Sequence, residues 1–383
     1  MGIRVENLHK SFGTEQVLDG ITLDIPDRSF FSVVAPTGAG KTTLLRIMAG
    51  IESADAGTVH YDGEEMTDVA VQDRSVGMVY QEFINYPSLT VRENLASPLQ
   101  VSDENYSAEE IERRVQETAE MLKIDHILNN LPEEVSGGEA QRTAISRALI
   151  KEPDYLFMDE PLANLDYKLR EQLRSDFERL FSEQDTTVIY ATPQAGDALA
   201  MSTHIGYLHD GKIIQDAPRD EIYFRPRHLP VAEYLGEPPM NVVPGTLIED
   251  NSDRYFELPD GARIATGSAT GSFPALNAGR EYMIGFRPQD MVYLNGAEAS
   301  EAHGHDTILE ADLAFVETVG STSTLHLEYQ GRELYALNAG PVHTATEATL
   351  SFSLDPEKLY IYDSGSGELL AAGNKIPSFT TQK

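Results

Sequence analysis

Two kinds of apolar pattern run along this chain, and together they predict alternating strands and helices. Short, mainly apolar runs at Phe30–Ala35, Tyr155–Met158 and Thr187–Ala191 are typical of strands that are buried on both faces. Apolar residues three and four apart predict amphipathic helices between these runs. The inner face of one such helix carries Leu169, Leu173, Phe177 and Leu180. The order of these elements predicts a mostly parallel α/β sheet.

Residues 90 to 150 interrupt this alternation with a predicted helical insert. The segment Ser107-Ala-Glu-Glu110 has the form of a capping box, in which a serine and a glutamate satisfy the first N–H groups of a helix. Apolar residues follow it at helical spacing: Ile111, Val115, Ala119 and Leu122. Before the insert, Ile3–Leu8 and Val17–Ile25 are expected to be strands around a turn at Gly13.

The pattern changes again near residue 240. The stretch Glu237-Pro-Pro-Met-Asn241 is linker-like, and beyond it short alternating runs such as Thr324–Tyr329 are separated by tight turns. These turns are expected at Asp260-Gly261, Asn295-Gly296 and Gln330-Gly331. We therefore predict two domains, an α/β domain over residues 1–240 and a small all-β barrel or sandwich over residues 241–383.

Composition narrows the classes of function. With a formal net charge of −33, the chain lacks the excess of basic residues that is typical of nucleic-acid-binding proteins. The chain has no cysteine, which excludes disulfides and thiolate metal sites. No apolar run is long enough to span a bilayer, and the first residues lack the apolar core of a signal peptide. We expect a soluble, cytoplasmic chain that can dock on a membrane protein.

The segment Ala35-Pro-Thr-Gly-Ala-Gly-Lys-Thr-Thr43 links a predicted strand to a predicted helix, as phosphate-binding loops do. Backbone N–H groups at a helix start attract phosphate, Lys41 is placed to reach the β- and γ-phosphates, and the Thr42 hydroxyl is placed to hold Mg²⁺. The expected ATP-binding residues are Pro36, Thr37, Gly38, Ala39, Gly40, Lys41, Thr42 and Thr43. An ordinary Gly-rich turn is the alternative, and Ala35 replaces the first glycine of the usual pattern. Phe12 is expected either to pack in the core or to stack on an adenine ring.

The order of the motifs resembles that of the ATP-binding subunits of ABC importers, most closely the carbohydrate-uptake class with a C-terminal regulatory domain. The motifs are the Gly-rich loop, Gln81 within Met78–Thr90, Val135-Ser-Gly-Gly-Glu139, Asp159-Glu160 and Ala163-Asn-Leu-Asp166. Pro238–Asn241 and Ile284–Pro288 extend the resemblance over nearly the whole chain. It implies a P-loop NTPase domain of the ABC type with a helical subdomain at about 90–150, followed by an OB-like (TOBE) regulatory domain.

The resemblance also implies roles for the residues at the strand ends. Asp159 would bind Mg²⁺ through its water shell, together with Thr42 and Gln81, and Glu160 would polarise the attacking water as the catalytic residue, assisted by Gln81. The loop after Gln81, Glu82 to Tyr86, would meet a membrane subunit. The alternatives are a solvated strand end for the two carboxylates and an ordinary polar strand end for Gln81.

Other motifs are implied to act between two subunits. Ser136, Gly137, Gly138 and Glu139 would complete the nucleotide site of the opposite subunit, so that two ATP molecules lie between two chains. Val135 and Glu139 depart from the usual Leu and Gln, and a glutamate adds repulsion toward a triphosphate unless its side chain points away. Asp166 would shape the dimer contact, or would simply cap the helix that starts at Tyr167.

A larger departure follows the strand Thr187–Ala191. The family places a histidine after the threonine to contact the γ-phosphate, whereas this chain has Pro193 there. Proline has neither an N–H nor a side-chain donor, so it cannot perform the role of that histidine. Gln194 is only a weak substitute.

These residues imply a motor subunit that uses ATP and Mg²⁺ to drive import of a carbohydrate, glycerol or polyol, as one half of an asymmetric pair of ATPase subunits. The alternative is a mainly regulatory, hydrolytically weak subunit. The implied partners are membrane-spanning permeases, a second ATP-binding subunit and, indirectly, a substrate-binding protein, with the chain on the cytoplasmic face of the membrane. A soluble ABC ATPase acting on ribosomes or DNA is a further alternative. It would be expected to have two ATP-binding units, a basic surface or a long coiled coil, and the sequence has none of these features. The C-terminal domain either reinforces the dimer or binds a regulator.

Overall fold

The computed structural model describes residues 2–82, 84–102, 106–163, 165–182, 185–250, 253–266, 273, 275–294, 307–342 and 348–378. Phe83, Asn164 and the expected turn at Asn295-Gly296 lie outside these residues. The chain forms two compact units, Met1–Arg219 and Asp220–Lys383. The division falls before the expected boundary at residue 240, because the helix α8 (Leu229–Tyr234) packs Ala232 into a cluster of the second unit.

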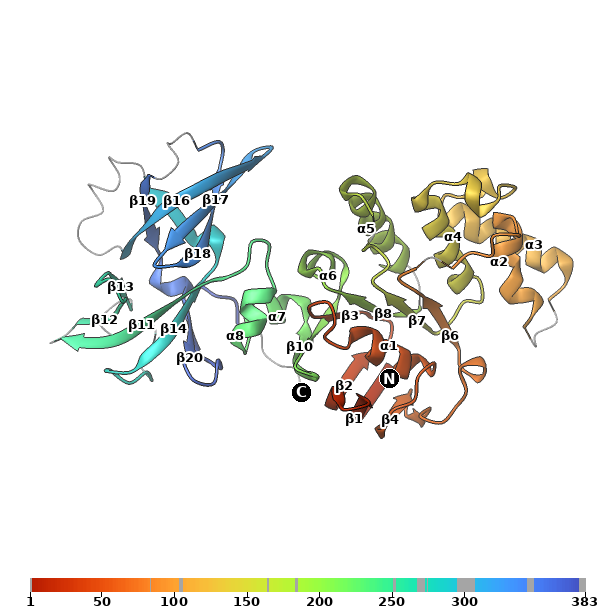
Figure 1. The fold of residues 1–383 in the computed structure, drawn as a ribbon, viewed down its shortest axis with the longest axis horizontal. Helices are drawn as coiled ribbons and strands as arrows, with labels where there is room; N and C mark the ends of the chain where they lie inside the picture. The colour runs from red at the N-terminus through yellow and green to blue at the C-terminus, as the bar shows by residue number, and fades with distance from the viewer. Residues whose placement is uncertain are drawn as a thin grey trace. The chain divides into compact units, whose positions relative to one another are not determined.

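The first unit is built on a six-stranded sheet with the order β10-β9-β3-β8-β7-β6 (Figure 1). All neighbouring pairs are parallel except β9 and β10, which confirms the predicted mostly parallel sheet. Its strands are β3 (Phe30–Val34), β6 (Val76–Val79), β7 (Tyr155–Asp159), β8 (Thr187–Thr192), β9 (His204–His209) and β10 (Lys212–Pro218).

Alternate side chains of this sheet enter two different cores, as the pleat of a strand requires. On β7, Tyr155 and Phe157 join one cluster of buried residues, and Leu156 and Met158 join the other. Helices cover one of these clusters, and α1 (Lys41–Ala49) with a second sheet covers the other, so both faces of the strands are buried and their sequences are continuous apolar runs.

A second sheet, antiparallel and with the order β2-β1-β4-β5, encloses the helix α1 (Lys41–Ala49) against the parallel sheet. Leu44, Leu45 and Met48 of α1 are fully buried in this layer. The strands expected at Ile3–Leu8 and Val17–Ile25 are longer in the structure. The strands are β1 (Gly2–Phe12), β2 (Glu15–Pro26), β4 (Ala56–Tyr61) and β5 (Glu64–Glu65).

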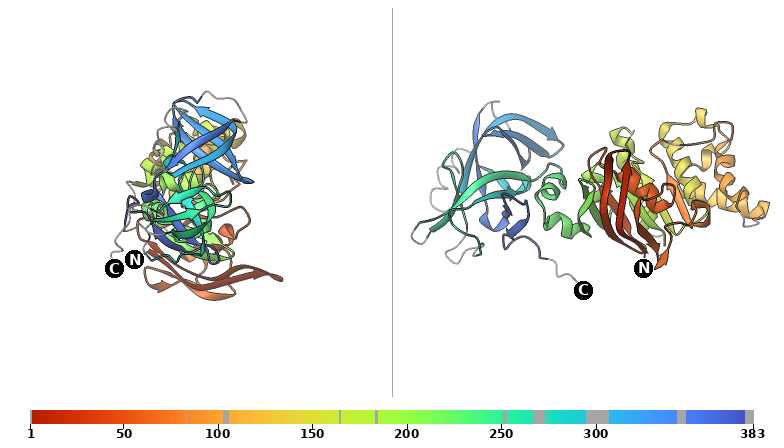
Figure 2. Two further views of the ribbon diagram at one scale, coloured as in Figure 1. Left: turned by 90° about the vertical axis from the view of Figure 1, so that its left-hand side faces the viewer. Right: turned by 60° about the horizontal axis from the view of Figure 1, so that its bottom comes forward.

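The predicted helical insert forms a group of helices beyond the β6 end of the sheet (Figures 1 and 2). Thr90 caps the first of them in a reciprocal capping box with Glu93, and Ser107 caps the next by accepting the Glu110 N–H. The remaining helices of this unit cover the sheet. The helices are α2 (Val91–Gln100), α3 (Ala108–Met121), α4 (Gly137–Leu149), α5 (Tyr167–Ser182) and α6 (Ala195–Met201).

The second unit consists of two antiparallel sheets that share one apolar core. One has the order β13-β12-β11-β14-β20-β21 and the other β15-β19-β16-β17-β18. The helices α7 (Arg219–Phe224) and α8 precede them. The strands are β11 (Asn241–Asp250), β12 (Asp253–Glu257), β13 (Arg263–Ala265), β14 (Glu281–Phe286), β15 (Met291–Leu294), β16 (Thr307–Val319), β17 (Thr322–Tyr329), β18 (Arg332–Ala339), β19 (Thr349–Leu354), β20 (Tyr360–Asp363) and β21 (Leu369–Ala372).

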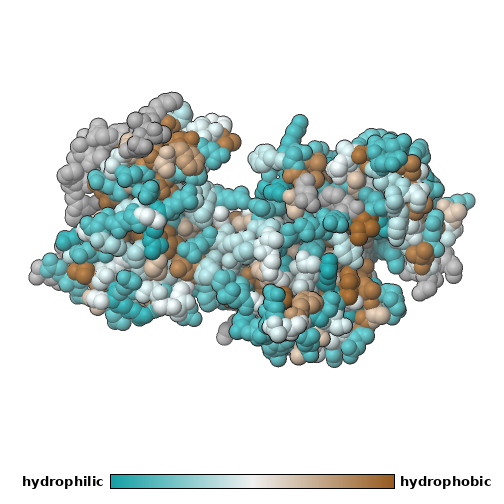
Figure 3. Space-filling model, viewed as in Figure 1, coloured by the Kyte–Doolittle hydropathy of each residue, from teal (hydrophilic) through white to brown (hydrophobic). Residues whose placement is uncertain are grey.

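The surface seen in Figure 3 is mostly hydrophilic, with separate apolar patches on both units. This agrees with the strong excess of acidic over basic residues in the sequence. Within the described part of the chain, none of the helices combines the length and apolar character needed to cross a bilayer.

Candidate nucleotide-binding site

The predicted site residues meet at one edge of the parallel sheet, where the strands end. The register pairs Val34 of β3 with Thr192 of β8, and Ala191 of β8 with Asp159 of β7. The Gly-rich loop, the two carboxylates and Pro193 therefore leave three neighbouring strands side by side. Gln81 follows β6, the next strand along, and is exposed. Ligands of open α/β sheets bind outside this carboxyl edge.

The Gly-rich loop has the backbone conformation of a phosphate cradle. Gly38 and Gly40 have φ angles of 85° and 102°, a region that residues with a Cβ rarely adopt. Helix α1 begins directly after Gly40, and no side chain among the described residues caps it. Its first N–H groups thus remain available to an anion at the positive end of the helix dipole. The residues present fit a nucleotide phosphate.

Lys41 is buried and held by three oxygen atoms at this edge. Its Nζ donates to the carbonyl oxygens of Ala35 and Pro36, each at 3.0 Å, and lies 3.1 Å from a carboxylate oxygen of Glu160. The side chains of Lys41 and Glu160 are only 2% and 10% exposed. A buried cation that faces the cradle is suited to neutralise phosphate charge.

Thr42 and Asp159 form the oxygen-rich corner of the site. The Thr42 hydroxyl donates to Asp159 Oδ1 at 2.9 Å. Burial raises the pKa of Asp159, and the negative charge of Glu160 adds to the rise, while the bond from Thr42 opposes it. A partly desolvated carboxylate beside a hydroxyl is a donor set that suits Mg²⁺, a cation that prefers oxygen ligands. The residues therefore fit the implied metal.

Phe12 lies at the end of β1 and is 50% exposed, so the expectation of core packing is wrong for this side chain. The Nζ atom of Lys10 lies 5.0 Å from the centre of its ring. An exposed ring of this kind leaves a face available for stacking.

Pro193 and Gln194 follow β8 directly, at the same edge as Glu160. The Gln194 N–H donates to the Thr192 hydroxyl at 3.0 Å, and the backbone N–H of Glu160 donates to the carbonyl of Ala191 at 3.0 Å. Pro193 therefore directly follows the strand that lies next to β7, which leads into Glu160. Proline has no N–H and no side-chain donor to offer at this position.

Ser136 to Glu139 start helix α4, as expected, and Glu139 is folded back on the helix start. The Ser136 N–H and hydroxyl both donate to Glu139 Oε2, at 2.8 and 2.7 Å. These bonds, the hydroxyl bond foremost, lower the pKa of Glu139. Sequence reasoning missed a further contact, in which His126 Nε2 lies 3.2 Å from the other carboxylate oxygen.

The two glycines of this motif have different surroundings. A Cβ added at Gly138 would lie 2.8 Å from the end of the Leu169 side chain of α5, so a larger residue there would require this leucine to move. At Gly137 an added Cβ would meet no described atom within 4 Å. Asp166 accepts the Leu169 N–H at 3.0 Å, so it caps α5, as one of the two expectations had it.

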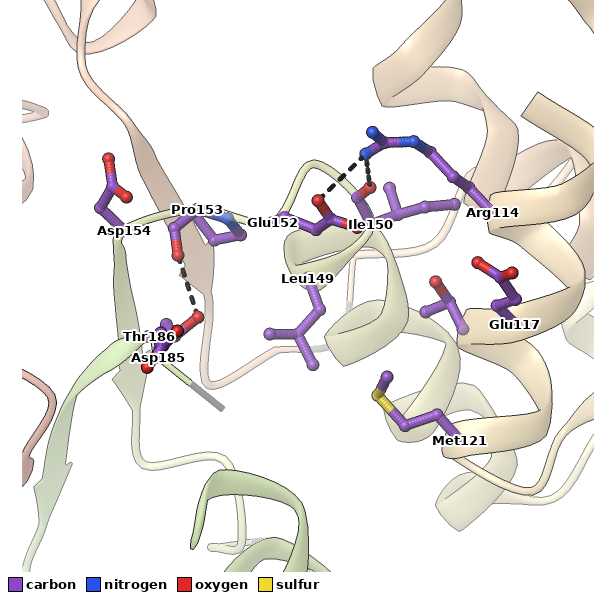
Figure 4. A pocket seen from close by; sticks show the side chains of 11 residues that line it. Arg114, Glu117, Met121, Leu149, Ile150, Glu152, Pro153, Asp154, Asp185 and Thr186 are labelled. Atoms are coloured by element: carbon purple, nitrogen blue, oxygen red, sulfur yellow. Dashed lines mark hydrogen bonds and ion pairs between the residues drawn. The ribbon is translucent and has the colours of Figure 1, made fainter. Parts of the chain in front are cut away.

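A separate cavity of about 310 Å³ lies at the opposite edge of the sheet (Figure 4). It opens between α3 and the segments that precede β7 and β8, which end in Asp154 and Thr186. Glu117, Glu152, Asp154 and Asp185 line it against a single described cation, Arg114. Its position and its acidic lining make it unsuitable for a triphosphate.

Comparison with known proteins gives a consistent answer for both units. The ABC transporter family model matches residues 18–163, and the MalK OB fold domain model matches residues 236–291. A xylose/arabinose import ATP-binding protein of Haloferax volcanii is 33% identical over 95% of this chain and 94% of its own length. The chain belongs to the ATP-binding subunits of ABC transporters.

Other relatives of this subunit have similar lengths. An alpha-glucoside transport ATP-binding protein of Rhizobium meliloti is 34% identical, covering 95% of this chain and 98% of the relative. An sn-glycerol-3-phosphate import ATP-binding protein of Salmonella typhi is 33% identical, covering 96% of this chain and 99% of the relative. Among solved structures, a post-hydrolysis dimer of an ATP-binding cassette with ADP and Pi has a TM-score of 0.51 and 30% identity, over 57% of this subunit and 98% of that chain.

Replacing Asp159 by asparagine tests the corner of the site. Because the pKa of this buried carboxylate is raised, its charged form destabilises the folded chain above that pKa. Asp159→Asn is therefore expected to raise the thermal midpoint of the nucleotide-free subunit at pH 7 by about 2–4 °C, corresponding to roughly 1 kcal/mol. The gain should shrink between pH 7 and a more acidic pH, because protonation removes the charge of the buried carboxyl.

The same substitution should weaken the Mg²⁺ dependence of ATP binding, because one carboxylate oxygen is lost. Thermal melts at both pH values, with and without Mg²⁺ and ATP, measure the two effects. A midpoint at pH 7 below that of the unaltered chain would contradict the assignment of Asp159 as a desolvated carboxylate.

Proposed function

We propose that this subunit hydrolyses ATP to drive an importer for a sugar, glycerol or polyol, bound to membrane-spanning permeases at the cytoplasmic face. The observation that carries the proposal is the single sheet edge at which the phosphate cradle, Lys41, Asp159 and Glu160 meet. The relatives named above are import or transport ATP-binding proteins for xylose and arabinose, alpha-glucosides and sn-glycerol 3-phosphate. Their names support the class of substrate.

In the proposed reaction the triphosphate binds the N–H groups at the start of α1. Lys41 leaves the Ala35 and Pro36 carbonyls and Glu160 to contact the β- and γ-phosphates. Glu160, released from this ion pair, accepts a proton from the attacking water. The water oxygen bonds to the γ-phosphorus as the bond from that phosphorus to the β–γ bridging oxygen breaks, which yields ADP and inorganic phosphate. Phe12 supplies the surface on which the adenine stacks.

Thr42, Asp159 and Gln81 would hold Mg²⁺ beside the phosphates. The ion supplies charge neutralisation during this transfer. Gln81 also lies after β6, so it is placed to link the site with the segment that follows it.

We further propose that the subunit pairs with a second, non-identical ATP-binding subunit. The missing donor at Pro193 supports this asymmetry, and Ser136, Gly137 and Gly138 would complete the partner's site, with Asp166 at the dimer contact. Gly137 faces open space among the described residues, as such a contact needs. The second candidate is a mainly regulatory, weakly hydrolysing subunit. Pro193 favours it, whereas the intact Glu160 opposes it.

A pull-down tests the transporter role against the soluble ABC ATPases. The tagged chain is expected to retain detergent-solubilised permease subunits and a second ATP-binding subunit, and not ribosomes. Alone, it is expected to be mainly monomeric and to hydrolyse ATP slowly. A purified homodimer with a turnover on the order of ten per second, a typical value for an enzyme, would contradict the asymmetric pairing.

The permease is proposed to dock beside the segment after Gln81. A cavity of about 580 Å³ there is lined by Tyr86, Ser88, Leu89, Ser97, Pro98, Val101 and Arg147. Tyr86 and Val101 are 45% and 83% exposed, which is high for apolar side chains. Asn94 fixes the segment by accepting the Tyr86 N–H at 2.8 Å and donating to the carbonyls of Tyr86 and Leu89. The Arg147 guanidinium covers the Tyr86 ring at 4.2 Å.

Val101→Glu is expected to weaken co-purification of the permeases at least about tenfold, because it places a charge in an apolar contact. ATP binding by the isolated chain should not change, since Val101 lies at the end of α2 in the helical insert and is not one of the residues of the nucleotide site. Val292→Glu, at an exposed valine of the second unit, is the matched control. Equal retention of the permeases by both variants would show that the docking surface lies elsewhere.

The second unit is proposed to reinforce the dimer or to bind a regulator. Its match to the MalK OB fold domain supports a regulatory class of subunit.

A further inference from the structure

Glu139 is the one acidic side chain in the motif that we propose to meet the partner's nucleotide. Its lowered pKa keeps it ionised at neutral pH. Its Oε2 atom accepts both the N–H and the hydroxyl hydrogen of Ser136, at 2.8 and 2.7 Å. A hydroxyl has one hydrogen, so Ser136 presents only lone pairs to any phosphate that approaches while this bond lasts. A negative charge next to the anion-binding end of α4 opposes the arrival of a second anion.

His126 lies on the other side of the same carboxylate. It belongs to a short 3-10 turn, Asp125–Ile127, and its Nε2 atom lies 3.2 Å from Glu139 Oε1. The neighbouring Ile127 and Leu128 are only 7% and 3% exposed, so the core of the helical group fixes the backbone of this turn. The His126 side chain itself is 60% exposed. Burial therefore does not explain its placement, and its contact is with the charge of Glu139.

We propose that His126 is a positioning residue that offsets the charge of Glu139 and thereby sets how strongly the start of α4 binds the nucleotide of a partner subunit. The inference depends on the proposed role of Ser136 to Gly138 between subunits. The ligand is the triphosphate group of a nucleotide bound in the partner. A donated hydrogen bond or a positive charge from His126 draws negative charge of the Glu139 carboxylate from Oε2 to Oε1. The bond from the Ser136 hydroxyl to Oε2 is then weaker, and the negative potential at the start of α4 is lower.

A double-mutant cycle tests this coupling. The full chain, carrying Glu160→Gln to slow hydrolysis, is examined with Mg²⁺ and ATP by sedimentation velocity over a range of protein concentrations. Glu139→Gln is expected to strengthen ATP-dependent self-association, because it removes the repulsive charge. His126→Ala alone is expected to weaken it about two- to fivefold for each contact, the range of an exposed ion pair. In the Glu139→Gln background, His126→Ala should have no effect.

A further variant separates this role from a merely structural one. His126→Lys is expected to restore association to at least the original level, since it supplies a positive charge beside Glu139 without an imidazole ring. His209→Ala is the matched control, because His209 is a partly exposed histidine 3.6 Å from Asp210 on another part of the first unit. ATP binding to the chain's own site should be the same in all variants. The coupling should also weaken at high salt.

Three outcomes would overturn the inference. One is an effect of His126→Ala no larger than that of His209→Ala, and another is a loss on His126→Ala that is equal with and without the Glu139→Gln substitution. The third is ATP binding without ATP-dependent association in the Glu139→Gln variant, from which the repulsive charge has been removed. This outcome would contradict the proposed role of α4 between subunits as well, whereas weak association of the chain with Glu139 intact agrees with it. Association that shows no coupling would contradict the role of His126 alone.

Discussion

Glu160→Gln in this subunit is expected to leave most of the ATPase activity of the assembled transporter, whereas the matching substitution in the second ATP-binding subunit removes most of it. The reason is Pro193, the residue after Thr192, which has no hydrogen to donate to the γ-phosphate. As the γ-phosphoryl group transfers, negative charge develops on its oxygens, and a donor held at this position would stabilise that charge. Loss of one such donor typically lowers the rate about 10²–10³-fold, or roughly 3–4 kcal/mol.

The site with Lys41, Asp159 and Glu160 of this chain should therefore bind ATP almost normally and turn over slowly. The measurement is the steady-state ATPase rate of the assembled transporter with each glutamate replaced in turn. Equal losses from the two substitutions would contradict the asymmetry. Pro193→His provides a second measurement, expected to raise the turnover of this site where the loop after β8 accommodates the new ring.

Lys41→Ala is expected to abolish tight nucleotide binding at this subunit. Lys41 is the only side-chain cation among the described residues that contacts Glu160, and its removal leaves the phosphates without a charged partner. A ligand at about a hundred times its Kd stabilises a folded protein by about 2.7 kcal/mol, which corresponds to a shift of about 5–10 °C for a unit of this size. Saturating ATP should therefore raise the thermal midpoint of the unaltered chain and leave that of the variant unchanged.

Lys151→Ala is the matched control for this experiment. Lys151 is exposed and lies between Ile150 and Glu152, two residues that line the cavity at the opposite edge of the sheet. The control variant loses the same positive charge away from the carboxyl edge, so ATP should protect it as well as the unaltered chain. Loss of protection in both variants would point to a general effect of charge.

The parallel sheet and the contents of its carboxyl edge could be predicted from the sequence, because both depend on local patterns. The runs at Tyr155–Met158 and Thr187–Ala191 are apolar throughout because both faces of these strands are covered, and that signal is read directly from the chain. Parallel strands then place all their carboxyl ends together. The edge therefore follows from the strands, without knowledge of side-chain contacts.

The contacts within the edge depend on tertiary structure and could not be predicted. The ion pair between Lys41 and Glu160 joins the start of α1 to the residue that follows β7, two places far apart in the sequence. The division of the chain at Arg219 also depends on packing, since α8 contributes to the core of the second unit while its sequence alone marks no boundary. His126 is exposed and irregularly placed, so no periodicity identifies its contact with Glu139.

One feature of the motif at α4 could have been predicted. Ser136 and Glu139 have the same spacing as Ser107 and Glu110, for which a capping box was expected. The rule that places the Ser107 side chain on the Glu110 N–H also folds Glu139 back on Ser136. The spacing therefore predicts that the Glu139 side chain folds back on the helix start and does not point away from it.

An equilibrium titration of the purified chain with ATP and Mg²⁺ tests the central claim most directly. The claim is that the loop from Ala35 to Thr43 and the edge with Asp159 and Glu160 form a nucleotide site. The unaltered chain and Lys151→Ala are predicted to bind one ATP per chain with the same affinity, and Lys41→Ala is predicted to show no tight binding. Unchanged ATP binding by Lys41→Ala would contradict the account.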